Sequence, residues 1–167
     1  MRMKPNKRRL PKIQRRVGEE NFYIIMSILS STNSGIQYFI KNWFNEHVHT
    51  KVELDIVKDE DGKFVRIDVK GNVAINFYKE SSFPEYIKFG NIDGSFECLY
   101  CELDSMDGFP KKVDGDFTCF NCPKISSIDG IPNTIGRDCI IRMCGKQFTE
   151  DEIRAKSKVS RYVYCNA

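Results

Sequence analysis

The sequence FECLYCEL at residues 96–103 decides the fold, because it recurs as FTCFNC at residues 117–122 and in part as CIIRMC at residues 139–144. The first two copies lead into similar turns, DGFP at 107–110 and DGIP at 129–132, and a weaker copy, VAI, starts at Val73. Periods of about 20 to 29 residues are typical of stacked solenoids. Residues 71–148 are therefore predicted to form a short β-solenoid, with parallel strands near 73–77, 96–99, 117–120 and 139–142.

Alternate residues of a strand point to opposite faces of a sheet, so one set of repeat positions should face the core. This inward set is predicted to be Phe96, Cys98, Phe117, Cys119, Cys139 and Ile141. The outward positions form one column of Leu99, Phe120 and Arg142 and a second column of Tyr100, Asn121 and Met143. Aromatic residues, Met and Arg are enriched in the cores of protein interfaces. We therefore expect the partner-binding residues to be Leu99, Tyr100, Phe120, Arg142 and Met143. In the alternative interpretation, the N-terminal helices or the C-terminal segment cover this face and make it ordinary core.

Residues 18–70 carry two other periodicities. Apolar residues at helical spacing form two stripes separated by a polar turn at residues 30–35, which predicts a helical hairpin. The stripes are Phe22, Ile25, Met26 and Leu29, and then Ile36, Phe39, Ile40, Trp43 and Phe44. Between residues 52 and 69 the apolar residues alternate instead, on either side of an Asp-Gly turn signal at residues 59–63. This pattern predicts a β-hairpin that leads directly into the solenoid.

The C-terminal residues 149–167 are expected to form a cap. Thr149 and Glu152 have the spacing of a capping box, which predicts a short helix from Glu150 to about Lys158. Such a helix would cover the open end of the solenoid, as terminal repeats must. The predicted fold class is therefore α+β: a helical hairpin and a β-hairpin that continue into a leucine-rich-repeat-like solenoid with a C-terminal cap.

Residues 1–17 form a basic arm, which we expect to be flexible. Eight of the 26 Lys and Arg residues lie in residues 1–16, where no acid occurs, so the remaining chain has 18 basic and 23 acidic residues. Clustered Lys and Arg attract nucleic-acid phosphates or an acidic protein surface. The arm's candidate binding residues are Lys7, Arg8, Arg9, Lys12, Arg15 and Arg16. The alternative is that the arm is only a solubilising tail.

The composition also predicts a compartment. No stretch approaches the roughly 18 apolar residues of a membrane helix, and the basic N-terminus lacks the apolar core of a signal peptide. The seven cysteines are an odd number and follow the register of the repeat. These observations favour a cytoplasmic protein with free thiols and no membrane partner.

Two interpretations compete for the cysteines. Cys98-x2-Cys101 and Cys119-x2-Cys122 have the spacing of a four-thiolate zinc site. The run from Phe96 to Leu103 also fits the leucine-rich-repeat pattern, in which an Asn or Cys ties the backbone turn. In the third copy Ile141 replaces the equivalent of Cys98 and Cys119, so these positions are expected to be core. We therefore favour a structural ladder and expect neither a metal nor a cofactor.

Residues 66–150 resemble small leucine-rich-repeat-like proteins encoded by tailed bacteriophages and related mobile elements. The repeats of that group read V-x-G-D-F-x-C-x-x-N-x-L-x-S-L-x-G-x-P. Here VDGDFTC at 113–119 and SSIDGIP at 126–132 match this pattern, as do IDGSFEC at 92–98 and SMDGFP at 105–110. The chain departs from the pattern at Cys101, Cys122 and Cys144, where Asn is usual. The resemblance implies a phage-type origin and a binding role.

Catalytic signals are weak. His47 and His49 would project from one face of a strand, where they could bind a metal or act as acid and base. No carboxylate or thiol completes such a site, and the sequence has no phosphate-binding loop, HExxH or GxSxG motif. We therefore expect a protein that is not an enzyme.

The leading functional hypothesis is a phage-type inhibitor that docks on a host protein in the bacterial cytoplasm. The expected target is a defence effector that handles nucleic acids, such as a CRISPR nuclease, alone or as a nucleoprotein complex. One alternative is a regulator that binds RNA or DNA directly through residues 2–16. Another is a structural or virion protein that uses the repeat to assemble.

Overall fold

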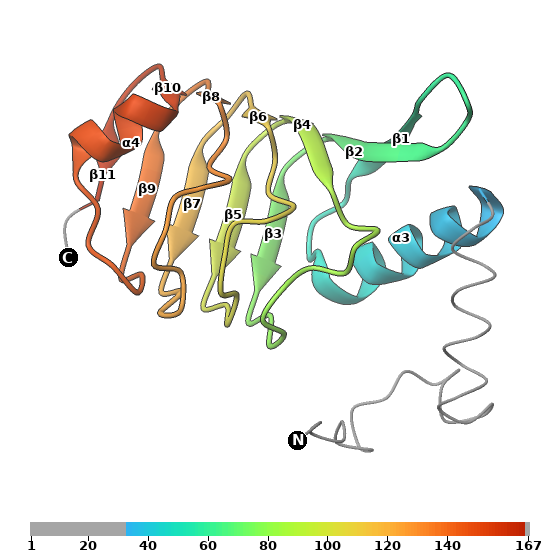
Figure 1. Ribbon diagram of the computed structural model, residues 1–167, viewed down its shortest axis with the longest axis horizontal. Coiled ribbons are helices and arrows are strands. Elements are labelled where there is room, and N and C mark those ends of the chain that lie inside the picture. The colour runs from blue at the N-terminus through green and yellow to red at the C-terminus, as the bar shows by residue number, and fades with distance from the viewer. Residues whose placement is uncertain (1–32, 166–167) are drawn as a thin grey trace.

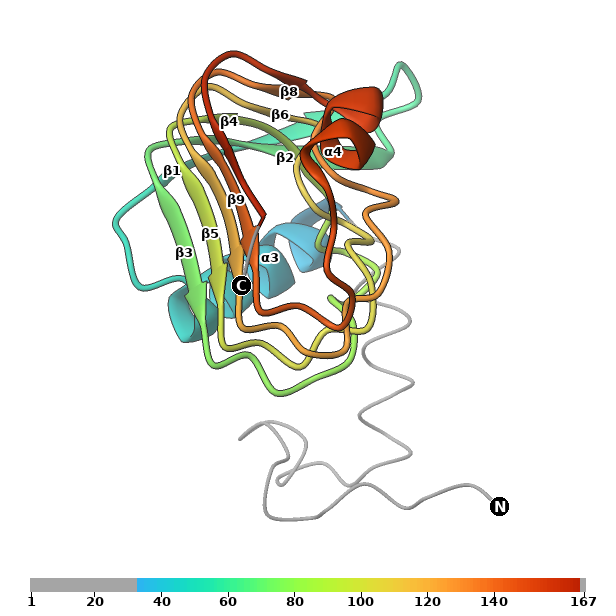
Figure 2. The same cartoon turned by 90° about the vertical axis from the view of Figure 1, so that its left-hand side faces the viewer.

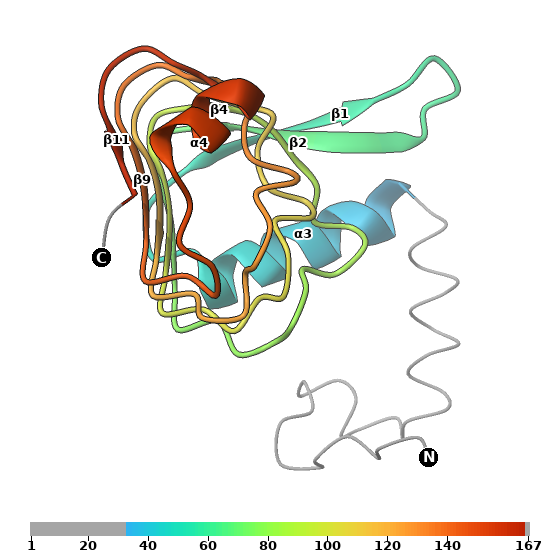
Figure 3. The same cartoon turned by 60° about the vertical axis from the view of Figure 1, so that its left-hand side comes forward.

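The computed structural model describes residues 33–165, which form a β-solenoid of about four turns with two helices (Figure 1). Each turn contributes one strand to each of two sheets. The coils lie almost directly over one another when the solenoid is viewed along its length (Figures 2 and 3). The expected mixture of helices and a repeat solenoid is therefore confirmed at this level.

The first sheet has five parallel strands in the order β11-β9-β7-β5-β3. They are β3 (Val73–Asn76), β5 (Phe96–Leu99), β7 (Phe117–Phe120), β9 (Cys139–Arg142) and β11 (Val163–Tyr164). Phe96 is opposite Phe117, which is opposite Cys139, so the predicted register is confirmed. The inward set is also confirmed, because all six side chains are buried. In this interior the rings of Phe96 and Phe117 stack with centroids 5.9 Å apart.

The second sheet was not predicted. Its order is β1-β2-β4-β6-β8-β10, and β1 (Glu53–Lys58) and β2 (Phe64–Lys70) form the predicted β-hairpin. β2 then pairs in parallel with β4, so the hairpin is continuous with the solenoid wall. The other strands are β4 (Phe89–Asp93), β6 (Lys112–Val113), β8 (Thr134–Ile135) and β10 (Lys158–Val159). Three of these strands have only two residues, too few to show an alternating pattern.

Helix α3 (Asn33–His47) closes the N-terminal end of the solenoid. The Trp43 ring contacts Tyr78, Phe83 and Phe89, and the Phe44 ring also contacts Phe89. This helix is the second of the predicted helical hairpin. The first predicted helix lies outside the described residues.

Helix α4 (Glu150–Lys156) forms in the last connection, and its predicted capping box is present. The Thr149 hydroxyl accepts from the Glu152 amide, and the Glu152 carboxylate accepts from the Thr149 amide. The residues after α4 supply β10 and β11 and so extend both sheets, which the sequence analysis did not predict.

Side chains link the coils at the corner between the two sheets. The side chain of each linking residue accepts a hydrogen bond from a backbone amide one coil further on. The acceptors are Asn72, Ser95, Asp116 and Asp138, and the last of these receives the amide of Tyr162. Glycine is required beside this ladder, because a Cβ at Gly136 would lie 2.2 Å from the carbonyl oxygen of Asp114.

Candidate functional site

The residue that follows each of four strands in the five-stranded sheet has a positive φ. These residues are Phe77 (58°), Tyr100 (56°), Asn121 (51°) and Met143 (54°), and we call them the left-handed column. The left-handed region costs an L-residue roughly 1–2 kcal/mol, and among non-glycine residues Asn is one of those that enter it most readily. Three of the four positions nevertheless carry a large apolar side chain.

The left-handed turn places a cysteine thiol inside the coil. Cys101 Sγ donates to the carbonyl oxygens of Leu99, at 3.3 Å, and of Ile75 in the preceding coil, at 3.5 Å. Cys122 and Cys144 repeat this arrangement one and two coils later, with sulfur–oxygen distances of 3.6 to 3.7 Å. The thiols therefore tie the turns together, as the ladder interpretation expects.

The column side chains themselves point to solvent. The exposed fractions are 61% for Phe77, 42% for Tyr100 and 56% for Met143, so no element of the described chain covers them. The rings of Phe77 and Tyr100 stack with centroids 5.2 Å apart and planes 11° apart. The Tyr100 ring also meets Phe120 edge to face at 5.7 Å. The result is a continuous aromatic strip along the carboxyl ends of the strands, which point to one edge of the solenoid in Figure 1.

The predicted outward columns lie beside this strip. Leu99, Phe120 and Arg142 end β5, β7 and β9 and are in register with one another. Leu99 and Phe120 are half-buried, whereas Arg142 is exposed. We call Phe77, Leu99, Tyr100, Phe120, Arg142 and Met143 together the edge surface. All five residues proposed from the sequence for the solenoid face belong to it.

Phe77 is the member that the sequence analysis missed. Its signal was present, because the weak copy at Val73 places Phe77 in the same repeat position as Tyr100. The candidate arm residues, in contrast, lie outside the described residues.

Charged groups border the edge surface. Glu102 lies 3.6 Å from Lys79 Nζ and 3.4 Å from Lys124 Nζ, so its carboxylate is shared by two lysines from neighbouring coils. A shallow depression between this ion pair and the strip is lined by Phe77, Tyr100, Asn121 and Pro123. An apolar centre with a charged border is the usual anatomy of a protein interface.

The expected histidine pair on one strand is wrong. His47 is the last residue of α3, and His49 follows the isolated bridge between Val48 and Ile75. The His47 ring packs against Trp43 and Tyr78, with centroids 5.1 and 5.0 Å away. Burial lowers the pKa of His47, an effect that Glu46 partly offsets. The two imidazoles therefore belong to different elements, although His49 is near enough to contribute to the lowered pKa of His47.

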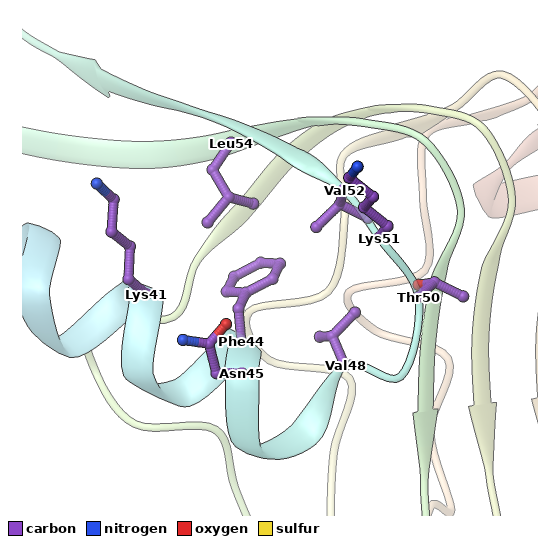
Figure 4. Close-up of a pocket in the computed structure, with 8 residues that line it drawn as sticks. All are labelled: Lys41, Phe44, Asn45, Val48, Thr50, Lys51, Val52 and Leu54. Carbon is purple, nitrogen blue, oxygen red and sulfur yellow. The ribbon is translucent and has the colours of Figure 1, made fainter.

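A second hollow of about 370 Å³ lies between α3 and β1 (Figure 4). Its floor is apolar, and its charged lining groups are the amines of Lys41 and Lys51. No carboxylate or thiol lines it.

Comparison of the chain with protein-family models, curated proteins and solved structures finds no match. In residues 33–165, neither helix has the length and apolar character needed to span a membrane.

Proposed function

We propose that this chain is a non-enzymatic binding protein that docks on another protein through the edge surface. The observation that carries this proposal is that strain and exposure coincide at Phe77, Tyr100 and Met143. Strained backbone persists where the surrounding structure enforces it, and it clusters at functional positions. Apolar side chains that are half exposed gain less stability from burial in the free protein than core residues do, whereas in a complex they supply contact area.

Asn121 shows that the turn accepts a polar residue. It occupies the same turn as its three neighbours with a side chain suited to a positive φ. The fold therefore does not require Phe, Tyr or Met at this position. An aromatic and methionine strip with a neighbouring Arg matches the composition of interface hot spots.

The partner that we propose is a host protein which the chain inhibits, in a setting of phage-type mobile elements. The resemblance to leucine-rich-repeat-like phage proteins supports this choice. The basic arm favours a target that handles nucleic acid, such as a defence nuclease. The nucleic-acid channel of such a target would attract the eight positive charges of the arm.

The test replaces one large side chain of the left-handed column by Asn, which adopts a positive φ more readily. Candidate defence nucleases are purified, and binding is measured by calorimetry with wild type and Tyr100→Asn. We expect the substitution to weaken binding by about 2 kcal/mol or more, roughly 30-fold, with no loss of melting temperature. Lys111→Asn, at the residue before β6 of the other sheet, is the matched control and should bind as wild type. Equal affinity of Tyr100→Asn and wild type would refute the edge surface as the docking site.

The basic arm carries a second candidate function, direct binding of RNA or DNA. Replacing Arg8, Arg9, Arg15 and Arg16 by Ala would then weaken binding to an oligonucleotide and flatten its dependence on salt, because fewer counterions are released. Tyr100→Asn should leave this binding unchanged. An unaltered salt slope in the arm variant would make the arm a tail. Recovery of the protein in purified phage particles would instead favour an assembly role.

A further inference from the structure

Three cysteine sulfurs meet inside the solenoid. The Sγ atoms of Cys98, Cys101 and Cys122 lie within 4.8 Å of one another, and all three residues are fully buried. Cys98 comes from the inner face of β5, Cys101 from the turn that follows, and Cys122 from the equivalent turn of the next coil. We propose that these three thiols bind one soft metal ion, and that the ion is Cu(I).

The three sulfur atoms lie close to the positions that a trigonal metal site requires. A metal–sulfur distance of about 2.3 Å in a trigonal site places the sulfurs roughly 4 Å apart. Sulfurs that already lie within 4.8 Å of one another reach this arrangement by side-chain shifts of less than about 1 Å. The triad spans two coils, so a bound ion would also fasten one coil to the next.

The donor set selects the ion. Thiolates favour soft ions such as Cu(I), and structural zinc almost always takes four ligands. A further thiol, Cys119, approaches Cys144 at 3.8 Å and also interacts with Cys122, but it is not within 4.8 Å of all three triad sulfurs. Cysteine binds a metal as a thiolate, so one Cu(I) takes the place of three thiol protons, which leave to solvent, and the site then carries a charge of −2.

The hydrogen bonds that the Cys101 and Cys122 thiols donate are compatible with metal binding. A thiol is a weak donor, and the sulfur–oxygen contacts of Cys101 and Cys122 span 3.3 to 3.6 Å. An Asn amide would satisfy the same carbonyls better, so cysteine at these positions gains the fold little as a donor. Cys101 also borders the shallow depression beside Tyr100, so the triad lies close to the molecular surface.

The experiment titrates the full reduced chain with Cu(I) under anaerobic conditions, in competition with a chromophoric Cu(I) chelator. We expect one ion per chain, a thiolate-to-copper absorption band and a higher melting temperature with the ion bound. Cys122→Asn keeps a ladder donor and removes the sulfur, so Cu(I) affinity should fall about 100-fold or more. Cys144→Asn makes the same exchange one coil beyond the triad and should bind as wild type.

A second variant distinguishes loss of the metal site from misfolding. Cys98→Val replaces a core thiol by an apolar side chain, as Ile141 does in the third copy, and should also lose the ion while circular dichroism stays unchanged. The proposal is overturned if the folded wild type binds no Cu(I). It is equally overturned if Cys122→Asn and Cys98→Val bind as tightly as wild type, or if the chain binds Zn(II) and not Cu(I).

Discussion

At the scale of single residues, three positions with a positive φ carry large apolar side chains, although Asn adopts this backbone conformation more readily. Phe77, Tyr100 and Met143 occupy a backbone region that Asn121 occupies more easily. Their exposure means that burial compensates for little of the strain, although the rings of Phe77 and Tyr100 stack on each other. The residue pattern therefore separates stability from binding, and each can be tested by its own measurement.

Met143→Asn should stabilise the free protein by roughly 1 kcal/mol, because it relieves backbone strain and removes little buried area. Urea unfolding followed by circular dichroism measures the change. Met143→Leu keeps an apolar side chain at the same φ and should leave the free energy of unfolding unchanged. A lower stability for Met143→Asn would show that the Met143 side chain supports the fold.

His47 should make stability depend on pH. Burial lowers its folded-state pKa, so the unfolded chain binds a proton more readily. Stability is then complete above the unfolded pKa of about 6.5 and falls as the pH drops toward the lower folded value. The free energy of unfolding between pH 7.5 and about 5 should decrease more in wild type than in His47→Gln, in which the carboxylates still titrate. Parallel curves would contradict a role for His47.

At the scale of elements, the last coil depends on one arginine of α4. The Arg154 guanidinium donates to the carbonyl oxygens of Val159, at 3.0 Å, and Arg161, at 2.8 Å, and to the Glu150 carboxylate. It thereby satisfies backbone groups of the segment that includes β10 and β11, whose strands have only two residues each. The helix closes the repeat through hydrogen bonds as well as through the buried Ile153.

Arg154→Met should loosen β10 and β11, since two carbonyl oxygens lose their donor at about 1–3 kcal/mol each if water does not replace it. Hydrogen exchange should accelerate at the amides of Lys158 and Ser160, which bond to the preceding coil. Lys158→Met is the control, because it changes an exposed side chain in the same strand. Unchanged exchange would mean that sheet pairing alone holds the last coil.

At the scale of the molecule, each coil contacts mainly its neighbours, as in other solenoids. α3 covers one end of the stack, and the segment from Glu150 to Tyr164 completes the other. The edge surface crosses four coils, so its shape depends on the stacking of all of them.

Deleting residues 146–167 should abolish cooperative unfolding, because the coil that contains β8 and β9 loses its neighbour and exposes Ile135, Cys139 and Ile141. Calorimetry and light scattering should show a broad transition and aggregation. The control replaces the exposed Tyr162 and Tyr164 by Ser and should melt close to wild type. A sharp transition in the deleted chain would show that the first coils fold alone.

The sequence by itself determined the coil period, four strands of the five-stranded sheet and their inward residues. These features could be predicted because they repeat, and a period or an alternation is a local property of the chain. The capping box of α4 and the β-hairpin were also predicted from local signals. Most of the edge surface followed from the same register, although Phe77 was hidden in the weakest copy.

Only the tertiary structure decided the rest. The second sheet has two-residue strands that become strands only when the coils stack. The meeting of Cys98, Cys101 and Cys122 depends on the distance between coils, which spacing along the chain does not contain. The sequence also did not show whether the left-handed column is exposed, because the covering of a face by another element depends on how distant segments pack.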